Sequence, residues 1–187
     1  MQRVISPVRL LALACVALPL SLTGTAQADV SSWLYVGGGA GLLSDDGSSG
    51  RLVPALQLET GMGTPPANSL IFGGVLQTRT YFGEGTDLAL LARGTTHGYA
   101  NGDWGLALDV GPYFRWWGAG SEGALVGVGI GAPWGITLSG VAGFGSYGAT
   151  TFGATLGIDL ARFTVYRRSG DAWWKNPFPA YRPDEPF

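Results

Sequence analysis

Residues 103–117 have the sequence DWGLALDVGPYFRWW, in which apolar side chains recur at every second position. The even-numbered set is apolar throughout: Trp104, Leu106, Leu108, Val110, Pro112, Phe114 and Trp116. The odd-numbered set up to residue 115 is polar, charged or small apart from Tyr113: Asp103, Gly105, Ala107, Asp109, Gly111, Tyr113 and Arg115. Because successive side chains of a β-strand point to opposite faces, this period predicts a strand with one apolar face.

The same alternation continues on both sides of this segment. Apolar stretches bounded by Gly, Asp, Asn, Ser or Pro clusters predict eight strands, at 32–43, 51–63, 69–82, 87–99, 103–117, 122–131, 134–146 and 149–166. Asn101-Gly102 is the strongest hairpin signal in the chain. Connections this short require antiparallel neighbours, because a parallel crossover needs about a dozen residues or more. The sequence therefore predicts an all-β, eight-stranded antiparallel up-and-down barrel.

The composition bears on which face of this barrel points outward. Of the 187 residues, 46% are hydrophobic and only 13% are charged, and the mean hydropathy is +0.21. The polar face of the strands is mostly Gly, Ala and Thr with isolated charges, which is too sparse to cover a soluble surface. We therefore expect a transmembrane β-barrel with its apolar face toward lipid. A soluble, lipocalin-like ligand-binding barrel of the periplasm is the alternative.

Aromatic residues near the strand ends fit the membrane interpretation. Barrels of this kind carry aromatic girdles at both membrane interfaces. We expect the girdles to be formed by Trp33, Phe82, Trp104, Trp116, Trp117 and Trp134.

The first 28 residues have the pattern of a cleaved signal peptide. Arg3 and Arg9 precede an apolar run at 10–22, and Ala26 and Ala28 supply the small residues before a cut ahead of Asp29. The single cysteine, Cys15, lies within this segment, so the mature chain would contain no thiol, disulfide or thiolate metal site. A lipoprotein signal around Cys15 is the alternative. Export, together with the barrel pattern, predicts localisation in a bacterial outer membrane.

These patterns divide the chain into a signal peptide (1–28), a barrel (29–166) and a tail (167–187). The tail interleaves aromatic residues with prolines and charges, so it is not a strand. With an even number of strands it would lie in the periplasm. Three interpretations are open: an interfacial segment anchored by its tryptophans, a plug in the barrel mouth, or a peptide that docks a periplasmic partner.

Charged residues on the inward face predict a packed, ion-paired lumen. An eight-stranded barrel is just wide enough for side chains to fill its interior. The predicted lumen cluster comprises Glu59, Arg79, Arg93, Asp109, Arg115 and Asp159. We expect Arg93 to pair with Glu59 or Asp109 and to block conduction; a gated conductance or proton path is the alternative.

No enzyme or cofactor motif accompanies this pattern. His97 is the only histidine, which excludes a multi-histidine metal site. Residues 118–123 spell G-x-G-x-x-G, but no helix or later acidic residue completes a dinucleotide site, so we interpret them as a hairpin turn. We therefore expect no cofactor and no metal. The formal net charge is −2, and loss of Arg3 and Arg9 with the signal peptide would make the mature chain more acidic, which argues against nucleic acid as a partner.

The eight alternating segments at 31–166 resemble the small bacterial outer-membrane barrels, such as the transmembrane domain of outer-membrane protein A. This resemblance implies contact with outer-membrane lipid and with the barrel-insertion machinery. Similar barrels include lipid A deacylases, which use a His-x-Ser-Asn stretch, and acyltransferases; here His97 is followed by Gly98, Tyr99 and Ala100. We therefore expect a non-enzymatic barrel with a structural or interaction role, and keep a lipid-modifying enzyme or a small channel as alternatives.

Overall fold

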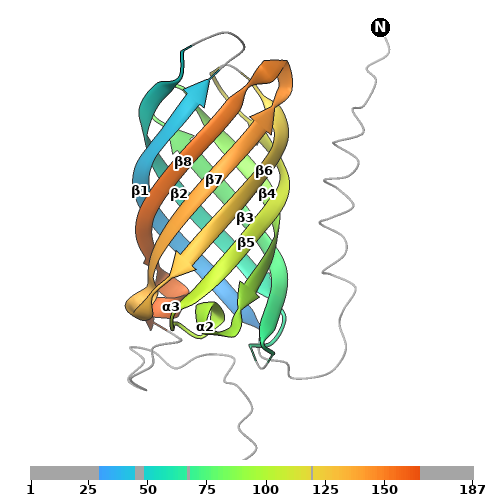
Figure 1. The fold of residues 1–187 in the computed structure, drawn as a ribbon, viewed down its shortest axis with the longest axis vertical. Coiled ribbons are helices and arrows are strands. Elements are labelled where there is room, and N and C mark those ends of the chain that lie inside the picture. Colours follow the sequence, from blue (N-terminus) through green and yellow to red (C-terminus); the bar gives the residue numbers. More distant parts are fainter. Residues whose placement is uncertain (1–29, 45–48, 67, 119, 165–187) are drawn as a thin grey trace, which may run out of the picture.

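The computed structural model describes residues 30–44, 49–66, 68–118 and 120–164, which form a closed barrel of eight antiparallel strands (Figure 1). Each strand pairs with the next along the chain, and β1 pairs with β8 to close the barrel. The strands are β1 (Ser31–Ser44), β2 (Arg51–Gly63), β3 (Leu70–Tyr81), β4 (Gly85–Thr96), β5 (Gly105–Arg115), β6 (Glu122–Gly131), β7 (Ile136–Gly145) and β8 (Thr150–Asp159). The predicted all-β, up-and-down architecture is confirmed. The expected signal peptide and tail lie outside the described residues.

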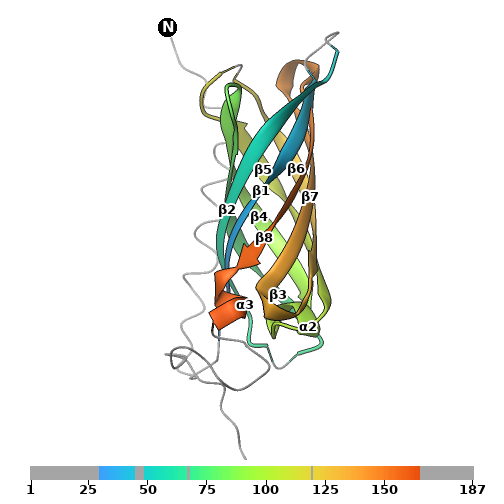
Figure 2. The ribbon, with the colours of Figure 1, turned by 90° about the vertical axis from the view of Figure 1, so that its left-hand side faces the viewer.

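Short helices occupy the two ends of the barrel. At the lower end in Figure 1 lie α2 (His97–Ala100), η2 (Pro133–Gly135) and α3 (Leu160–Thr164), and η3 (Ser146–Gly148) lies at the upper end. Figure 2 shows α2 and α3 at the same end of the barrel. Among the described residues, no helix has the length and apolar character needed to cross a bilayer.

Two predicted strands extend three or more residues beyond the C-terminal ends of the observed strands. The predicted strand 87–99 stops at Thr96, because the Asn101 N–H donates to the His97 carbonyl at 3.0 Å and closes a helical turn. The predicted strand 149–166 stops at Asp159, whose Oδ1 accepts a hydrogen bond from the Arg162 N–H at 3.1 Å. A side-chain oxygen in this position caps a helix N-terminus, so α3 begins where β8 ends.

Two of the tight turns put a bulky residue in the left-handed region. Trp134 has φ 70° and Tyr147 has φ 58°, and the glycine after each also has a positive φ. Two successive positive φ values are typical of the type I′ turn that joins antiparallel strands. Each turn therefore takes Trp-Gly or Tyr-Gly where Asn-Gly is the favoured pair.

The two faces of the strands differ sharply in polarity. On β5, Leu108 is 58% exposed, whereas its neighbour Asp109 is 3% exposed. The same division holds on every strand, so large apolar side chains cover the outside. The most exposed of them on the strands include Leu52, Met62, Leu70, Phe72, Leu106, Leu108, Val110, Phe144 and Leu156.

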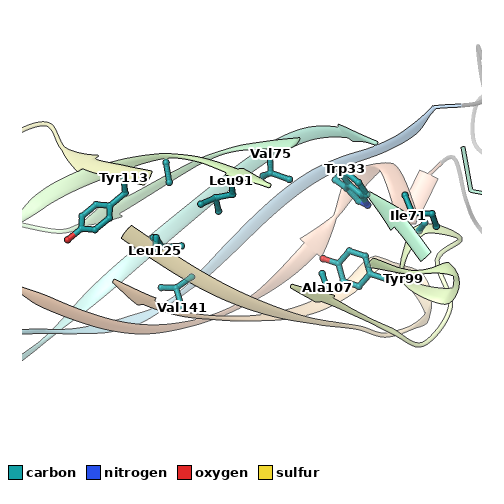
Figure 3. Packing of buried hydrophobic residues seen from close by; sticks show 11 residues of the cluster. Trp33, Ile71, Val75, Leu91, Tyr99, Ala107, Tyr113, Leu125 and Val141 are labelled. Atoms are coloured by element: carbon teal, nitrogen blue, oxygen red, sulfur yellow. The ribbon is translucent and has the colours of Figure 1, made fainter. Parts of the chain in front are cut away.

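Buried apolar side chains share the interior with the polar ones (Figure 3). Trp33, Ile71 and Tyr99 lie near one end of the barrel, and Tyr113 lies toward the other. Leu91 and Leu125 lie between these two groups. Buried apolar side chains are therefore distributed along the length of the interior.

Candidate functional site: the charged lumen

Eight charged side chains are buried inside the described part of the barrel, four of each sign. They are Glu59, Arg79, Asp87, Arg93, Asp109, Arg115, Asp159 and Arg162. Isolated buried charges are costly, so their partners decide what the lumen can do.

Arg93 is the centre of the main cluster. From β4, its Nε and Nη2 donate to the two carboxylate oxygens of Asp109 on β5, both at 2.7 Å. Its Nη2 also donates to Glu59 Oε2 on β2 at 2.7 Å, across the lumen. All three side chains are at most 5% exposed. Two of the expected lumen carboxylates thus share one guanidinium.

A hydrogen-bonded network of neutral groups extends this cluster toward the other strands. Glu59 Oε1 accepts from Gln77 Nε2 at 2.7 Å and from Gln57 Nε2. Gln57 also donates to Ser139 Oγ at 3.1 Å and accepts from Thr155 Oγ1 at 2.9 Å. The network therefore joins β2, β3, β7 and β8 across the barrel interior.

Trp33 lies inside the barrel, and its assignment to the aromatic girdle is wrong. It is 1% exposed, and the Arg93 guanidinium lies 5.4 Å from its ring centroid. On β1, Trp33 shares the inward face with Tyr35. Gly61 and Gly63 on β2 leave the space that its indole occupies, because a Cβ at either position would contact the ring. The position of Trp33 at the start of a strand suggested a girdle residue. However, the residues at every second position of this strand, Ser31, Trp33 and Tyr35, point inward.

The other five expected girdle residues lie on the outer surface. Trp104 (68% exposed) and Trp134 (60%) lie at the lower end, and Phe82 (56%), Trp116 (76%) and Trp117 (45%) lie at the upper end.

A second ion pair lies in the upper lumen. Arg115 donates through Nε and Nη2 to the two oxygens of Asp87, at 2.6 and 3.0 Å. Its guanidinium also lies 5.3 Å from the ring centroid of Tyr81. Asp87 lies outside the predicted cluster, although it has the same parity as Arg93 in the predicted strand 87–99. Its register position directly opposite Arg115 is the signal that would have included it.

Arg79 makes no ion pair among the described residues, although it is only 1% exposed. Its Nη2 donates to Gln57 Oε1. Its Nε and Nη1 have no hydrogen-bond partner within the part of the chain that is described.

The lower mouth is closed by Arg162, a residue outside the predicted cluster. Its guanidinium donates to Thr137 Oγ1 (2.9 Å), the Asp103 carbonyl (2.9 Å) and the Ala132 carbonyl (3.2 Å). It also lies 4.5 Å from the ring centroid of Tyr99. Burial raises the pKa of the Tyr99 phenol above its usual range, so the ring facing the guanidinium stays neutral. Had β8 continued, Arg162 would have faced outward; the helical turn of α3 turns it in.

Asp159, the remaining expected lumen residue, accepts hydrogen bonds from backbone N–H groups and forms no ion pair among the described residues. Its Oδ1 accepts from the Leu34 N–H at 3.3 Å and from the Arg162 N–H. It therefore ties the start of α3 to β1.

His97 does not face the lumen. It is exposed in α2, and its Nε2 lies 2.7 Å from Asn101 Nδ2. Within the described ranges, no group of three His, Cys, Asp or Glu residues is arranged to hold a metal ion.

Comparisons with protein-family models, with curated proteins and with solved structures gave no match to this chain.

Proposed function

We propose that this protein is a non-enzymatic transmembrane β-barrel of a bacterial outer membrane, with a structural or interaction role and a packed lumen. The observation that carries the proposal is the inverted distribution of polarity. Charged side chains such as Arg93 and Asp109 are buried, while Leu108 and Val110 beside them are more than half exposed. In water, both the burial of charged side chains and the exposure of large apolar side chains would be unfavourable. Lipid around the barrel would favour apolar side chains on the outside and charged side chains in the lumen.

Strand length and aromatic placement support the same proposal. The strands are 10 to 14 residues long, and a tilted strand of about 9 to 11 residues spans the hydrocarbon core of a bilayer. The exposed tryptophans lie toward the two ends, where membrane barrels place their aromatic girdles. Outer-membrane lipid and the barrel-insertion machinery are the partners this proposal implies.

The filled interior favours a structural role over ligand binding. A lipocalin-like protein encloses a cavity for its ligand, whereas here Arg93 bridges the lumen to Glu59 and large apolar side chains occupy the space beyond. A channel would likewise need a continuous water path past the Arg93 cluster.

Fractionation separates the membrane proposal from the soluble alternative. The protein should sediment with outer membrane on a sucrose gradient, and the unheated protein should migrate faster on a denaturing gel than the heated protein. Release of the protein by osmotic shock would contradict the proposal and favour the periplasmic barrel.

A further inference from the structure

Arg79 is a buried cation whose charge no described carboxylate compensates directly. Asp87 lies opposite it in the β3–β4 register, but Arg115 occupies both oxygens of that carboxylate. Glu84, which follows β3, pairs with Arg51 at 2.8 Å. The upper lumen therefore contains two arginines and one carboxylate among the buried described residues: Arg79, Arg115 and Asp87.

Three hydrogen-bond donors at this level lack a partner among the described residues. They are Nε and Nη1 of Arg79 and the hydroxyl of Tyr81, which is 0% exposed. The two side chains share the inward face of β3, where the Tyr81 hydroxyl lies close to the Arg79 guanidinium and its own O–H has no acceptor among the described residues. An anion is bound by hydrogen-bond donors that lack other acceptors and by a nearby positive charge, and both are present at this place.

The facing wall leaves room for these groups. Gly41 on β1 and Gly153 on β8 are direct cross-strand partners. A Cβ at Gly153 would contact Arg79 Nη1, and a Cβ at Gly41 would contact the Tyr81 ring. The two side chains thus extend across the upper lumen and pack against the backbone at Gly153 and Gly41, where there is no side chain.

The surroundings restrict the size and charge of an occupant. Gln57 lies beside Arg79, and Leu43 and Ala55 pack with Tyr81, all of them at most 5% exposed. These neighbours bury the two side chains, and the local excess at this level is a single positive charge, although the buried charges of the whole lumen number four of each sign. A small monovalent anion matches this single charge and accepts hydrogen bonds from any direction.

From these contacts we propose that Arg79 and Tyr81 form a buried binding site for a chloride-sized anion in the upper lumen. The anion neutralises the Arg79 charge and accepts hydrogen bonds from the guanidinium and the phenol. The proposal concerns the interior of the barrel and does not depend on whether lipid or water surrounds it.

Chloride titration of the folded, detergent-solubilised protein tests the site. Urea unfolding is measured at constant ionic strength while chloride replaces gluconate, a much larger monovalent anion. Above saturation, a tenfold increase in chloride should raise the ratio of folded to unfolded protein about tenfold, because the anion binds only the folded state. Arg79→Gln should abolish this dependence, and Arg51→Gln, at an exposed arginine, should keep it.

Bromide in crystals of the unaltered protein gives a second measurement that needs no variant. An anomalous peak in contact with Arg79 would support the site, whereas a peak without anomalous signal there would mean water and overturn it. An anion-independent unfolding midpoint, or a chloride dependence that survives in Arg79→Gln, would overturn the proposal as well.

Discussion

Removing Arg93 should destabilise the barrel strongly, and removing a carboxylate as well should restore part of the loss. Arg93→Ala leaves both Glu59 and Asp109 buried without their cation. Breaking a buried pair in this way costs about 3 to 5 kcal/mol, whereas replacing both partners together can be nearly neutral.

The contacts predict which double variant recovers more. Asp109 accepts its two hydrogen bonds from Arg93 alone among the described residues, whereas Glu59 keeps its amide donors Gln77 and Gln57. At about 1.5 to 3 kcal/mol for each hydrogen bond to a charged group, the Arg93–Asp109 coupling should exceed the Arg93–Glu59 coupling by about 1.5 kcal/mol or more.

Urea unfolding of the single and double Ala variants measures both coupling energies. Planar-bilayer conductance, measured in parallel, shows whether ions pass through the lumen. The exposed Arg51–Glu84 pair is the control, with an expected coupling of about 0 to 1 kcal/mol. We expect low conductance from the unaltered protein and an increase in Arg93→Ala. Additive losses at all three positions, together with high conductance before any substitution, would refute the ion-paired plug and favour a pore.

Three further predictions concern the outer face, the lower mouth and one turn. Leu108→Arg should cost about 2 to 4 kcal/mol of folding free energy in lipid, whereas Ala107→Ser on the inner face should fold normally; equal tolerance would show that the barrel is not surrounded by lipid. Arg162→Gln should lower the free energy of unfolding by about 3 kcal/mol, because three hydrogen bonds at the lower mouth are lost, and an unchanged urea midpoint would exclude that role. Tyr147→Asn should stabilise by about 1 kcal/mol in the same assay, because asparagine tolerates a positive φ, and destabilisation would contradict the strained-turn interpretation.

The outward and inward faces of the strands were predictable from the sequence. Leu108 and Asp109 are adjacent in the chain, and a strand must send them to opposite sides. The same local rule, with short turns between segments, was enough to predict the number of strands and their antiparallel order. It also placed Glu59, Arg93 and Asp109 on the face that became the lumen.

Local patterns were less reliable where strands end. Thr96 and Asp159 are followed by residues that continue the alternation, yet hydrogen bonds from Asn101 and Arg162 turn the chain into short helices. Alternation does not distinguish one more strand residue from a helical turn over three or four positions. His97 therefore lies exposed in a helical turn, and Arg162 lies in the lumen.

Only the closed tertiary structure decided which inward charges meet. Arg93 reaches Glu59 from two strands away, and Arg115 takes the carboxylate that lies equally opposite Arg79. These choices depend on strand tilt, on register and on where glycines such as Gly153 leave space, and none of these is a property of neighbouring residues. The odd or even position of a residue in its strand determines whether its side chain points inward or outward. Which side chain it contacts across the lumen depends on how all eight strands close into the barrel.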